Sequence, residues 1–521
     1  MAQTLVSDTA LANGRQCVAN LLKARETQLS VLTEKFWTII GSGSIGAKAE
    51  ELMRKTWAIE RAGFDVNPRT VLAMGFFDAF RERCGLNAAL TRGASSEELQ
   101  KIVGGGQFEE AEMKVLRRLV KQIHKDFRGI PLAVRSSAHG DCRGTGIYDS
   151  EFCINLNNEV KTLDGLVKAI KAVMISEFSE SAIVFRKDLG LLGGVAVIIE
   201  PVFGQRFKKH TDSEGIIRFG PKYGGFGYTS HNTGGHVVFA AGLPTTAVKG
   251  NGIKVKESDK RTPSQIQDDE EERLSAGLHY RKLTDYLSDG KFLYVTKKDF
   301  DDVTIALGTV AFNKLDWLFV KLKKLEQLTG KPQYVEFAIV ENEGQIHVAI
   351  LQIADADQKQ LNDEKEIAET EKTVIRSGYV KGSGEVESDT ILFVQKEDDI
   401  RLLRKLNRDL ADFVVVYVGD LTKSIQDNPL EYADISNARV IVETAGYSGK
   451  TNHRDAPEGH FGGLLDTTKK IFMIGVDIDW ERLGRPETVT HVYGGKVLIF
   501  HKKVRVTASE KQQKAVVEIV E

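Results

Sequence analysis

The sequence predicts an α/β (α+β) protein with more than one domain. Amphipathic helices alternate with short apolar strands through the first two-thirds of the chain. A polar stretch at residues 355–373 contains few apolar side chains and indicates a boundary. Short β-rich runs separated by helices follow it and predict a compact α/β domain of about 130 residues. A chain of 521 residues is long enough for roughly two to four domains.

Composition and charge exclude several classes of protein. A formal net charge of -2 argues against bulk electrostatic attraction to nucleic acid or to an anionic membrane. The first residues lack the basic start and apolar run of a signal peptide, and the most apolar stretch, 189–203, is too short to span a bilayer. The four cysteines show no CxxC pair, which is typical of a reducing compartment. We therefore expect a cytoplasmic protein with no nucleic-acid or membrane partner.

Residues 132–157 carry the strongest chemical signal. An apolar strand leads to Arg135 and Ser136, then to a loop with Gly144 and Gly146, and then to a second strand at 152–156. Glycines let backbone N–H groups approach anionic oxygens, hydroxyls reach phosphate or metal, and a guanidinium forms charge-assisted hydrogen bonds. This combination suits a polyphosphate. The alternative is an ordinary β-hairpin with a glycine-rich turn.

A second glycine-rich segment, 41–48, precedes a predicted helix at 49–62. Lys48 lies at the start of that helix, where free N–H groups and the helix dipole favour an anion. A serine-capped linker is the alternative interpretation. Upstream, apolar residues at helical spacing predict an N-terminal helix over 14–39.

Further patterns predict the remaining elements of the first two-thirds. Strands are expected at 70–74 and 194–203, and irregular strands followed by a charged loop at 204–275. Helices are expected within 76–126, including one that begins with a capping box at Ser95, and at 163–178 continuing through 179–190 and at 310–328.

Two alternating strands at 332–352, joined by a turn at 342–344, predict a hairpin. Glu336 and Gln352 could project from its adjacent strands. A carboxylate and an amide oxygen on one face can hold Mg²⁺, because this hard cation prefers oxygen ligands.

Taken with these motifs, the chain resembles the phosphoenolpyruvate synthase and pyruvate phosphate dikinase family. The resemblance rests on Val-Arg-Ser-Ser-Ala at 134–138, the Gly loop after it, Ile-Gly-Ala-Lys-Ala at 45–49, and Leu-Gln at 351–352. It implies an ATP-grasp domain at 40–355, with lobes at approximately 40–203 and 204–355, after an N-terminal extension at 1–39. It further implies a linker at 356–375, a swivelling phosphohistidine-like domain at 376–510 and a tail at 511–521.

The resemblance also implies cofactors, ATP and Mg²⁺, and the residues that bind them. Expected nucleotide-binding residues are Lys48, Arg135, Ser136, Gly144, Gly146, Glu200, Val202, Glu336 and Gln352, of which Glu336 and Gln352 would also bind the metal. Three family features are replaced here. Glu200-Pro201 stands where the family has a glutamine and a methionine, Thr245 or Thr246 where it has an acid, and Ala354 where it has an arginine. Arg206, Lys208 or Arg218 would have to compensate for that arginine.

In the C-terminal part, the strand 439–443 leads to His453, as the family's strand leads to its phosphorylated histidine. A neutral imidazole is nucleophilic and can release a phosphoryl group again. His453 and Arg135 are therefore the expected catalytic residues, with His460 as the alternative carrier. Lys450 or Thr451 would orient the phosphate.

The resemblance implies an ATP-dependent phosphotransferase that phosphorylates a histidine, releases AMP and phosphate, and passes the phosphoryl group to a small-molecule hydroxyl or a partner subunit. The family's phosphoenolpyruvate-binding barrel has no counterpart after residue 506, so pyruvate is not the expected acceptor. A non-catalytic or regulatory ATP-binding subunit is the alternative. Simple carboxylate–amine ligation, a third possibility, would release ADP and would leave the C-terminal domain without a role.

Overall fold

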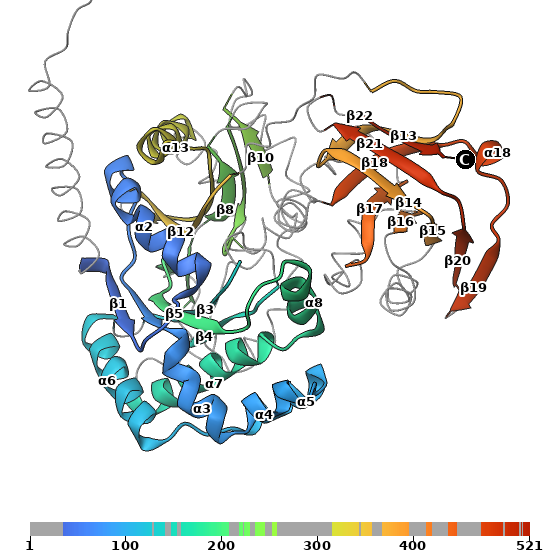
Figure 1. The fold of residues 1–521 in the computed structure, drawn as a ribbon. Helices are drawn as coiled ribbons and strands as arrows, with labels where there is room; N and C mark the ends of the chain where they lie inside the picture. Colours follow the sequence, from blue (N-terminus) through green and yellow to red (C-terminus); the bar gives the residue numbers. More distant parts are fainter. Residues whose placement is uncertain are drawn as a thin grey trace, which may run out of the picture.

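The protein is a mixed α/β molecule, which confirms the predicted fold class (Figure 1). The computed structural model describes residues 35–127, 130–140, 147–153, 158–207, 218–221, 223–229, 235–244, 253–257, 315–342, 345–356, 367–394, 413–418, 436–444, 470–492, 495–509, 512 and 514–520. In those residues the principal sheets have five, five and ten strands. No helix in the described part combines the length and the apolar character needed to cross a membrane.

The first sheet has the order β1-β2-β5-β3-β4. Its strands are β1 (Trp37–Ile40), β2 (Arg69–Leu72), β3 (Leu132–Ala138), β4 (Ser150–Cys153) and β5 (Val195–Pro201). β1 pairs in parallel with β2, so the helix predicted over 14–39 is wrong at its end. The remainder of that helix falls on residues 1–34, outside the described residues. Pairing with a strand far along the chain overrides the local helical spacing.

Helices cover one face of this sheet. They are η1 (Met74–Phe77), α3 (Asp78–Arg83), α4 (Leu86–Thr91), α5 (Ser96–Gly105), α6 (Glu110–Phe127), α7 (Glu159–Ser176) and α8 (Glu180–Asp188). Leu166 and Ile170 of α7 share a core with Val134 and Val197 of the sheet.

Capping explains where two of these helices begin. The Ser95 side chain accepts a hydrogen bond from the Glu98 N–H at 3.3 Å, as the capping signal predicted. Ser179 caps α8 in the same way, accepting from the Ala182 N–H at 3.1 Å. For that reason α7 and α8 are separate, and the prediction that one helix continues into the other is wrong. The strand predicted at 70–74 also ends early, because η1 begins at Met74.

The opposite face of the first sheet packs on α2 (Gly46–Ala62), which also packs on the second sheet. The second sheet has the order β10-β9-β8-β11-β12. Its strands are β8 (Tyr223–Tyr228), β9 (His236–Ala241), β10 (Ile253–Lys256), β11 (Gln333–Asn342) and β12 (Gln345–Asp355), and α13 (Leu315–Thr329) covers it beside α2. Leu52 and Ile59 of α2 share a core with Ile198 of the first sheet and Phe337 of the second.

The hairpin predicted at 332–352 is confirmed as β11 and β12. A short pair of strands, β6 (Gln205–Phe207) and β7 (Arg218–Gly220), lies between the two sheets in the chain order.

The C-terminal part forms one sheet of the order β14-β21-β22-β13-β18-β17-β16-β15-β20-β19. Its elements are β13 (Thr373–Lys381), β14 (Gly384–Ser388), β15 (Ile391–Val394), β16 (Phe413–Tyr417), β17 (Ala438–Glu443), β18 (Ile471–Ile478), α18 (Trp480–Leu483), β19 (Thr488–Val492), β20 (Gly495–Phe500), β21 (Val504–Ser509) and β22 (Lys514–Ile519). The four strands from β15 to β18 run parallel.

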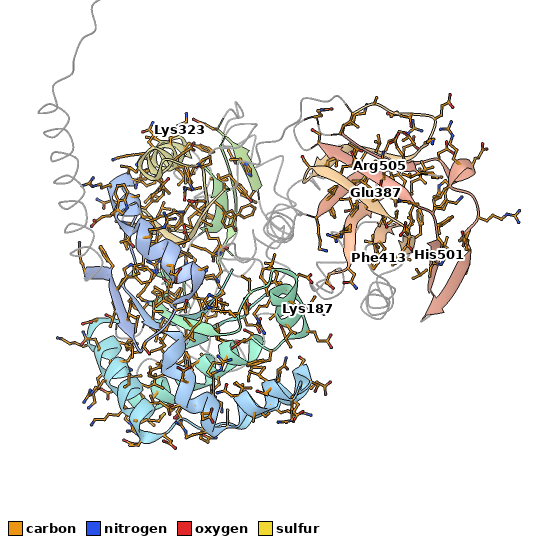
Figure 2. The ribbon with its side chains drawn as sticks, in the orientation of Figure 1. Lys187, Lys323, Glu387, Phe413, His501 and Arg505 are labelled. Atoms are coloured by element: carbon orange, nitrogen blue, oxygen red, sulfur yellow. The ribbon has the colours of Figure 1, made fainter. Side chains whose placement is uncertain are left out.

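The end of the chain is part of this sheet. β22 pairs with β21 and with β13, so the prediction of a tail is wrong for residues 514–519. The prediction failed because the apolar run in this strand is short and has charged neighbours in the sequence. Its residues Ala515, Val516 and Val517 are buried. At the sheet edge, Glu387 of β14 and Arg505 of β21 are directly opposed and form an ion pair of 2.8 Å (Figure 2).

Candidate functional site

Arg135 is the centre of a buried polar site between the first and second sheets. Its Nη2 donates to Gln352 Oε1 at 3.1 Å and to Glu336 Oε2 at 3.4 Å. Its Nη1 donates to the Leu351 carbonyl oxygen at 2.6 Å and to Glu200 Oε1 at 3.3 Å. Arg135 comes from β3, Glu200 from β5, and the other three from β11 and β12. One guanidinium therefore joins both sheets.

The structure thus brings together four of the residues that the sequence singled out, Arg135, Glu200, Glu336 and Gln352. Glu336 and Gln352 are opposite each other in the β11–β12 register, and their oxygens converge on one cationic nitrogen. Both side chains are buried. A site of two converging oxygens that holds a guanidinium also fits a hard divalent cation, provided that phosphate oxygens complete its ligands. In the described residues, no group of three or more His, Cys, Asp and Glu side chains gathers as an all-protein metal site.

Tyr334 fixes the carboxylate of Glu336 from the other side. Its hydroxyl donates to Glu336 Oε1 at 3.2 Å, while Arg135 contacts Oε2. Burial, together with the negative charge of Glu336, raises the pKa of the Tyr334 hydroxyl well above its ordinary value of 10.0. Tyr334 therefore stays protonated at neutral pH and donates a hydrogen bond to Glu336. Sequence reasoning missed it, although alternation along β11 places residues 334 and 336 on one face.

The N-terminus of α2, with Lys48 in its first turn, lies against β3. Ser137 Oγ accepts a hydrogen bond from the Ala49 N–H at 3.0 Å. Gly46 has a φ of +75°, and a Cβ there would lie 1.9 Å from the Ser137 carbonyl oxygen. Only glycine permits this approach, which places Lys48 at the contact between α2 and the strand that carries Arg135. The first turn of α2 is thus packed against β3 and is not a flexible linker.

Ser136 does not share a face with Arg135. Ser136 pairs with Val197, whose side chain belongs to the core on the helical face of the sheet, whereas Ser137 pairs with Ala196 on the α2 face. The alternation of strand side chains predicts this, because Arg135 and Ser137 are two residues apart. Ser137, rather than Ser136, therefore shares a face with Arg135, and the expected contact of Ser136 with the nucleotide stays a prediction.

Glu200 and Val202, expected at the adenine edge, have other partners. The Glu200 carboxylate pairs with Arg135 and with Arg69, whose Nε lies 2.8 Å from Glu200 Oε2. The Val202 N–H donates to the Pro131 carbonyl oxygen at 2.8 Å. A contact of this segment with a base stays a prediction, and it would have to use groups other than the Glu200 carboxylate and the Val202 N–H.

Ala354, at the position where the resemblance implied an arginine, is buried on the same face of β12 as Gln352. It lies opposite Tyr334, and the ring of Tyr334 packs with Phe226 and Tyr228 at centroid distances of 6.0 and 5.3 Å. Ala354 is therefore opposite a tyrosine that belongs to an aromatic cluster. The described side chains do not include the proposed substitutes Arg206, Lys208 and Arg218. Gly144, Gly146, Thr245, Thr246, Lys450, Thr451, His453 and His460 also lie outside the described residues.

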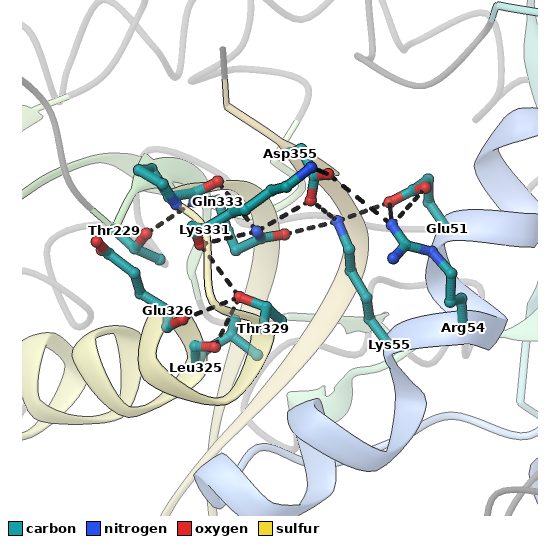
Figure 3. A network of polar contacts seen from close by, with 11 residues as sticks. Glu51, Arg54, Lys55, Thr229, Leu325, Glu326, Thr329, Lys331, Gln333 and Asp355 are labelled. Carbon is teal, nitrogen blue, oxygen red and sulfur yellow. Dashed lines mark hydrogen bonds and ion pairs between the residues drawn. The ribbon is translucent and has the colours of Figure 1, made fainter. Parts of the chain in front are cut away.

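A second buried network joins α2 to the second sheet and was not foreseen (Figure 3). Lys55 Nζ lies 2.6 Å from Glu51 Oε2, 2.6 Å from Asp355 Oδ1 and 2.7 Å from Gln333 Oε1. The Lys55 side chain is only 3% exposed. A lysine on the apolar face of a predicted helix, two turns after Lys48, was the signal that could have revealed it.

This network lowers the pKa of Asp355. Partial burial acts to raise that pKa, but hydrogen bonds from Lys55 and Gln333 outweigh it and lower the pKa from 3.8 to about 2. The folded-state pKa lies below the unfolded value, so the stabilisation is present above pH 4 and is lost as the pH falls towards 2. We expect Asp355→Asn to cost about 1 kcal/mol at pH 7, after allowance for the exposure of the carboxylate.

Urea unfolding between pH 7 and pH 3 measures this effect. The difference between wild type and Asp355→Asn should shrink as the pH falls below about 4, because the Asp355 carboxyl takes up a proton in the unfolded wild type while it stays ionised in the folded protein down to about pH 2. Asp477→Asn is the control, since Asp477 is exposed and forms a surface ion pair with Arg376. A difference for Asp355→Asn that stays constant over this pH range would contradict the assignment.

Two sheets that share one helix and enclose an arginine, a carboxylate and an amide define an α/β protein with a polar site between its sheets. The family model for the AMP/ATP-binding domain of pyruvate phosphate dikinase matches residues 33–374, which include Lys48, Arg135, Glu336 and Gln352. This match covers more than half of the chain, and the chain therefore belongs to that family, an AMP/ATP-binding family of phosphotransferases. A comparison with curated proteins finds no match.

Proposed function

We propose that the protein is an ATP-dependent phosphotransferase of the dikinase type. ATP, a histidine of the chain and water would give AMP, inorganic phosphate and phosphohistidine. The phosphoryl group would then pass to a small-molecule hydroxyl or to a partner subunit. This proposal goes beyond the family relationship, which supports AMP or ATP binding and phosphotransferase character.

The observation that carries the proposal is the convergence of Glu336 and Gln352 on Arg135. The oxygens of the first two lie within 3.4 Å of the same Arg135 nitrogen, at the contact between the two sheets. Mg²⁺ at these oxygens would neutralise charge on the phosphates and orient them. Arg135 would then turn towards the phosphate oxygens, where a guanidinium stabilises charge that develops during transfer.

Lys48 is the second phosphate contact in this proposal. It lies in the first turn of α2, a helix of 17 residues whose N-terminus abuts β3. The helix dipole and the lysine charge would act together on an anion at that end.

The order of strands along the chain in the C-terminal sheet supports the proposed transfer of a phosphoryl group to a histidine. In the sequence, His453 comes after the carboxyl end of β17 and before β18, and these two strands are parallel neighbours in the sheet. Ligand and reactive residues in parallel α/β sheets commonly follow the carboxyl ends of strands. His453 is therefore the proposed carrier and His460 the alternative.

Ala354 favours a second candidate function, a regulatory ATP-binding subunit. Its methyl group faces Tyr334 where the resembled family has a cationic side chain. Loss of that charge would leave nucleotide binding in place and would slow transfer. The products formed from ATP separate the two functions.

We expect the full chain with Mg²⁺ and ATP to form AMP and an acid-labile phosphoprotein, and Glu336→Gln to reduce both by at least about 100-fold, because the metal loses a charged ligand. ATP labelled at the β- or the γ-phosphate would be used in parallel. Label from the β-phosphate should remain on the protein, and label from the γ-phosphate should appear as free phosphate.

His453→Ala should abolish protein labelling and His460→Ala should preserve it. Formation of ADP without protein labelling would contradict the proposal and favour ligase chemistry. Tight Mg²⁺-dependent ATP binding with neither AMP nor label would support the regulatory subunit instead.

A further inference from the structure

A β-bulge places the two proposed metal ligands side by side. β11 and β12 pair regularly up to Phe337 opposite Ile350, and the register then shifts so that Glu336 lies opposite Gln352. Leu351 is the extra residue on β12. If the regular register continued without a bulge, Leu351 would lie opposite Glu336, and Gln352 would lie opposite Val335 and face the core beneath α2 and α13. Glu336 and Gln352, the two proposed metal ligands, are therefore neighbours only while β12 keeps this bulge.

Two arginines of the first sheet, Arg69, which is buried, and Arg135, which is partly buried, bind the carbonyl groups at this bulge. Arg69 Nη2 donates to the Ile350 carbonyl oxygen at 2.9 Å, and Arg135 Nη1 donates to the Leu351 carbonyl oxygen at 2.6 Å. Glu200 lies between the two arginines and pairs with each through a different oxygen. One carboxylate thus orients both guanidinium groups.

Arg69 is more deeply buried than Arg135. Its side chain is 1% exposed, its Nη1 donates to the Asn67 carbonyl oxygen at 3.2 Å, and its guanidinium lies over the ring of Trp37 at 5.3 Å. Burial lowers the pKa of Arg69, and the charge of Glu200 opposes that change. Arg69 reaches neither Glu336 nor Gln352 with its described contacts, and acts on them through the backbone of β12.

We propose that Arg69 is a positioning residue for the metal site, holding the bulge of β12 through the Ile350 carbonyl while Glu200 fixes its orientation. The inference rests on the proposed function. When Arg135 turns to the phosphates, the Arg69 contact with Ile350 keeps Gln352 beside Glu336. Loss of Arg69 therefore weakens metal binding more than it weakens binding of the nucleotide itself.

The test compares ATP binding to the full chain in EDTA and in excess Mg²⁺ by calorimetry. The ratio of the two dissociation constants is the factor by which Mg²⁺ strengthens ATP binding. For Arg69→Lys we expect this factor to fall about 10-fold, as for other residues that orient metal ligands. The dissociation constant for ATP in EDTA should stay within about threefold of the wild-type constant. Lysine keeps a charge for Glu200 but lacks the planar fork that reaches Glu200 and Ile350 together.

Arg83→Lys is the matched control. Arg83 on α3 contacts both oxygens of Glu112 at 2.6 and 2.8 Å, so the same substitution breaks a bidentate pair away from the bulge. Its Mg²⁺ factor should equal that of wild type. Glu200→Gln, which keeps the shape of the side chain, should lower the factor in the same direction and serves as the test if Arg69→Lys does not fold.

An unchanged Mg²⁺ factor in Arg69→Lys, or an equal loss of affinity in EDTA and in Mg²⁺, would overturn the inference. The proposed function fails separately, if wild-type protein binds ATP with no help from Mg²⁺. The urea concentration at the midpoint of unfolding would be measured for every variant. The ranking of the variants by this midpoint should differ from their ranking by the Mg²⁺ factor.

Discussion

Gly46→Ala is expected to destabilise the protein by about 3 kcal/mol or more, through a steric clash and a strained backbone together. The added Cβ would lie 1.9 Å from the carbonyl oxygen of Ser137, at a φ of +75°. The first turn of α2 would have to move away from β3 and would carry Lys48 with it. ATP affinity should therefore fall as well.

Urea unfolding followed by tryptophan fluorescence measures the loss, since Trp37, Trp57 and Trp317 all lie within the matched domain. Gly93→Ala is the control, because Gly93 has a φ of +74° and no atom within 4 Å of the position of a Cβ. It should cost only about 1 kcal/mol, the strain of the left-handed backbone alone. Equal losses in the two variants would show that the contact of α2 with β3 does not contribute.

Lys55→Met should cost about 3 kcal/mol, a value typical of removing one partner from a buried ion pair. The methionine fills the same space but leaves Asp355, Glu51 and Gln333 without their shared cation. The same fluorescence-detected unfolding in urea measures this change. The effect should also shrink at low pH, as Asp355 becomes protonated.

Arg54→Met provides the matched control one residue earlier. Arg54 also contacts Glu51, at 2.7 Å, and lies 4.0 Å from Asp355, but its side chain is 59% exposed. A surface pair of this kind contributes about 1 kcal/mol or less. If Arg54→Met cost as much as Lys55→Met, burial of the Lys55 charge would not be the cause.

Elements with local signals could be predicted from the sequence. The hairpin of β11 and β12 has a short turn between alternating strands, which predicts it. The capping box at Ser95 predicts the start of α5. Arg135, Glu336 and Gln352 could be chosen because their chemistry and the family resemblance agreed. The structure then brought these three together.

The features that could not be predicted depend on partners far along the chain. The local sequence of β1 predicts a helix, and its strand conformation follows from pairing with β2. The local sequence of β22 predicts a tail, and its strand conformation follows from pairing with β13. Arg69 and Glu200 are a buried ion pair from strands whose adjacency the sequence does not state. A bulge such as that at Leu351 changes which face a side chain occupies, and no local pattern in β12 announces it.

The position of α2 between two sheets has a consequence for biosynthesis. Its Lys55 meets Asp355, which lies 300 residues later in the chain. At ribosomal speeds of roughly 5–20 residues per second, about 15–60 s pass before that partner is made. Leu52 and Ile59, which pack against Phe337 in the finished protein, have no such neighbour during this interval. The nascent polypeptide can therefore cover this apolar helix face only with the first sheet until the strands of the second sheet have been synthesised.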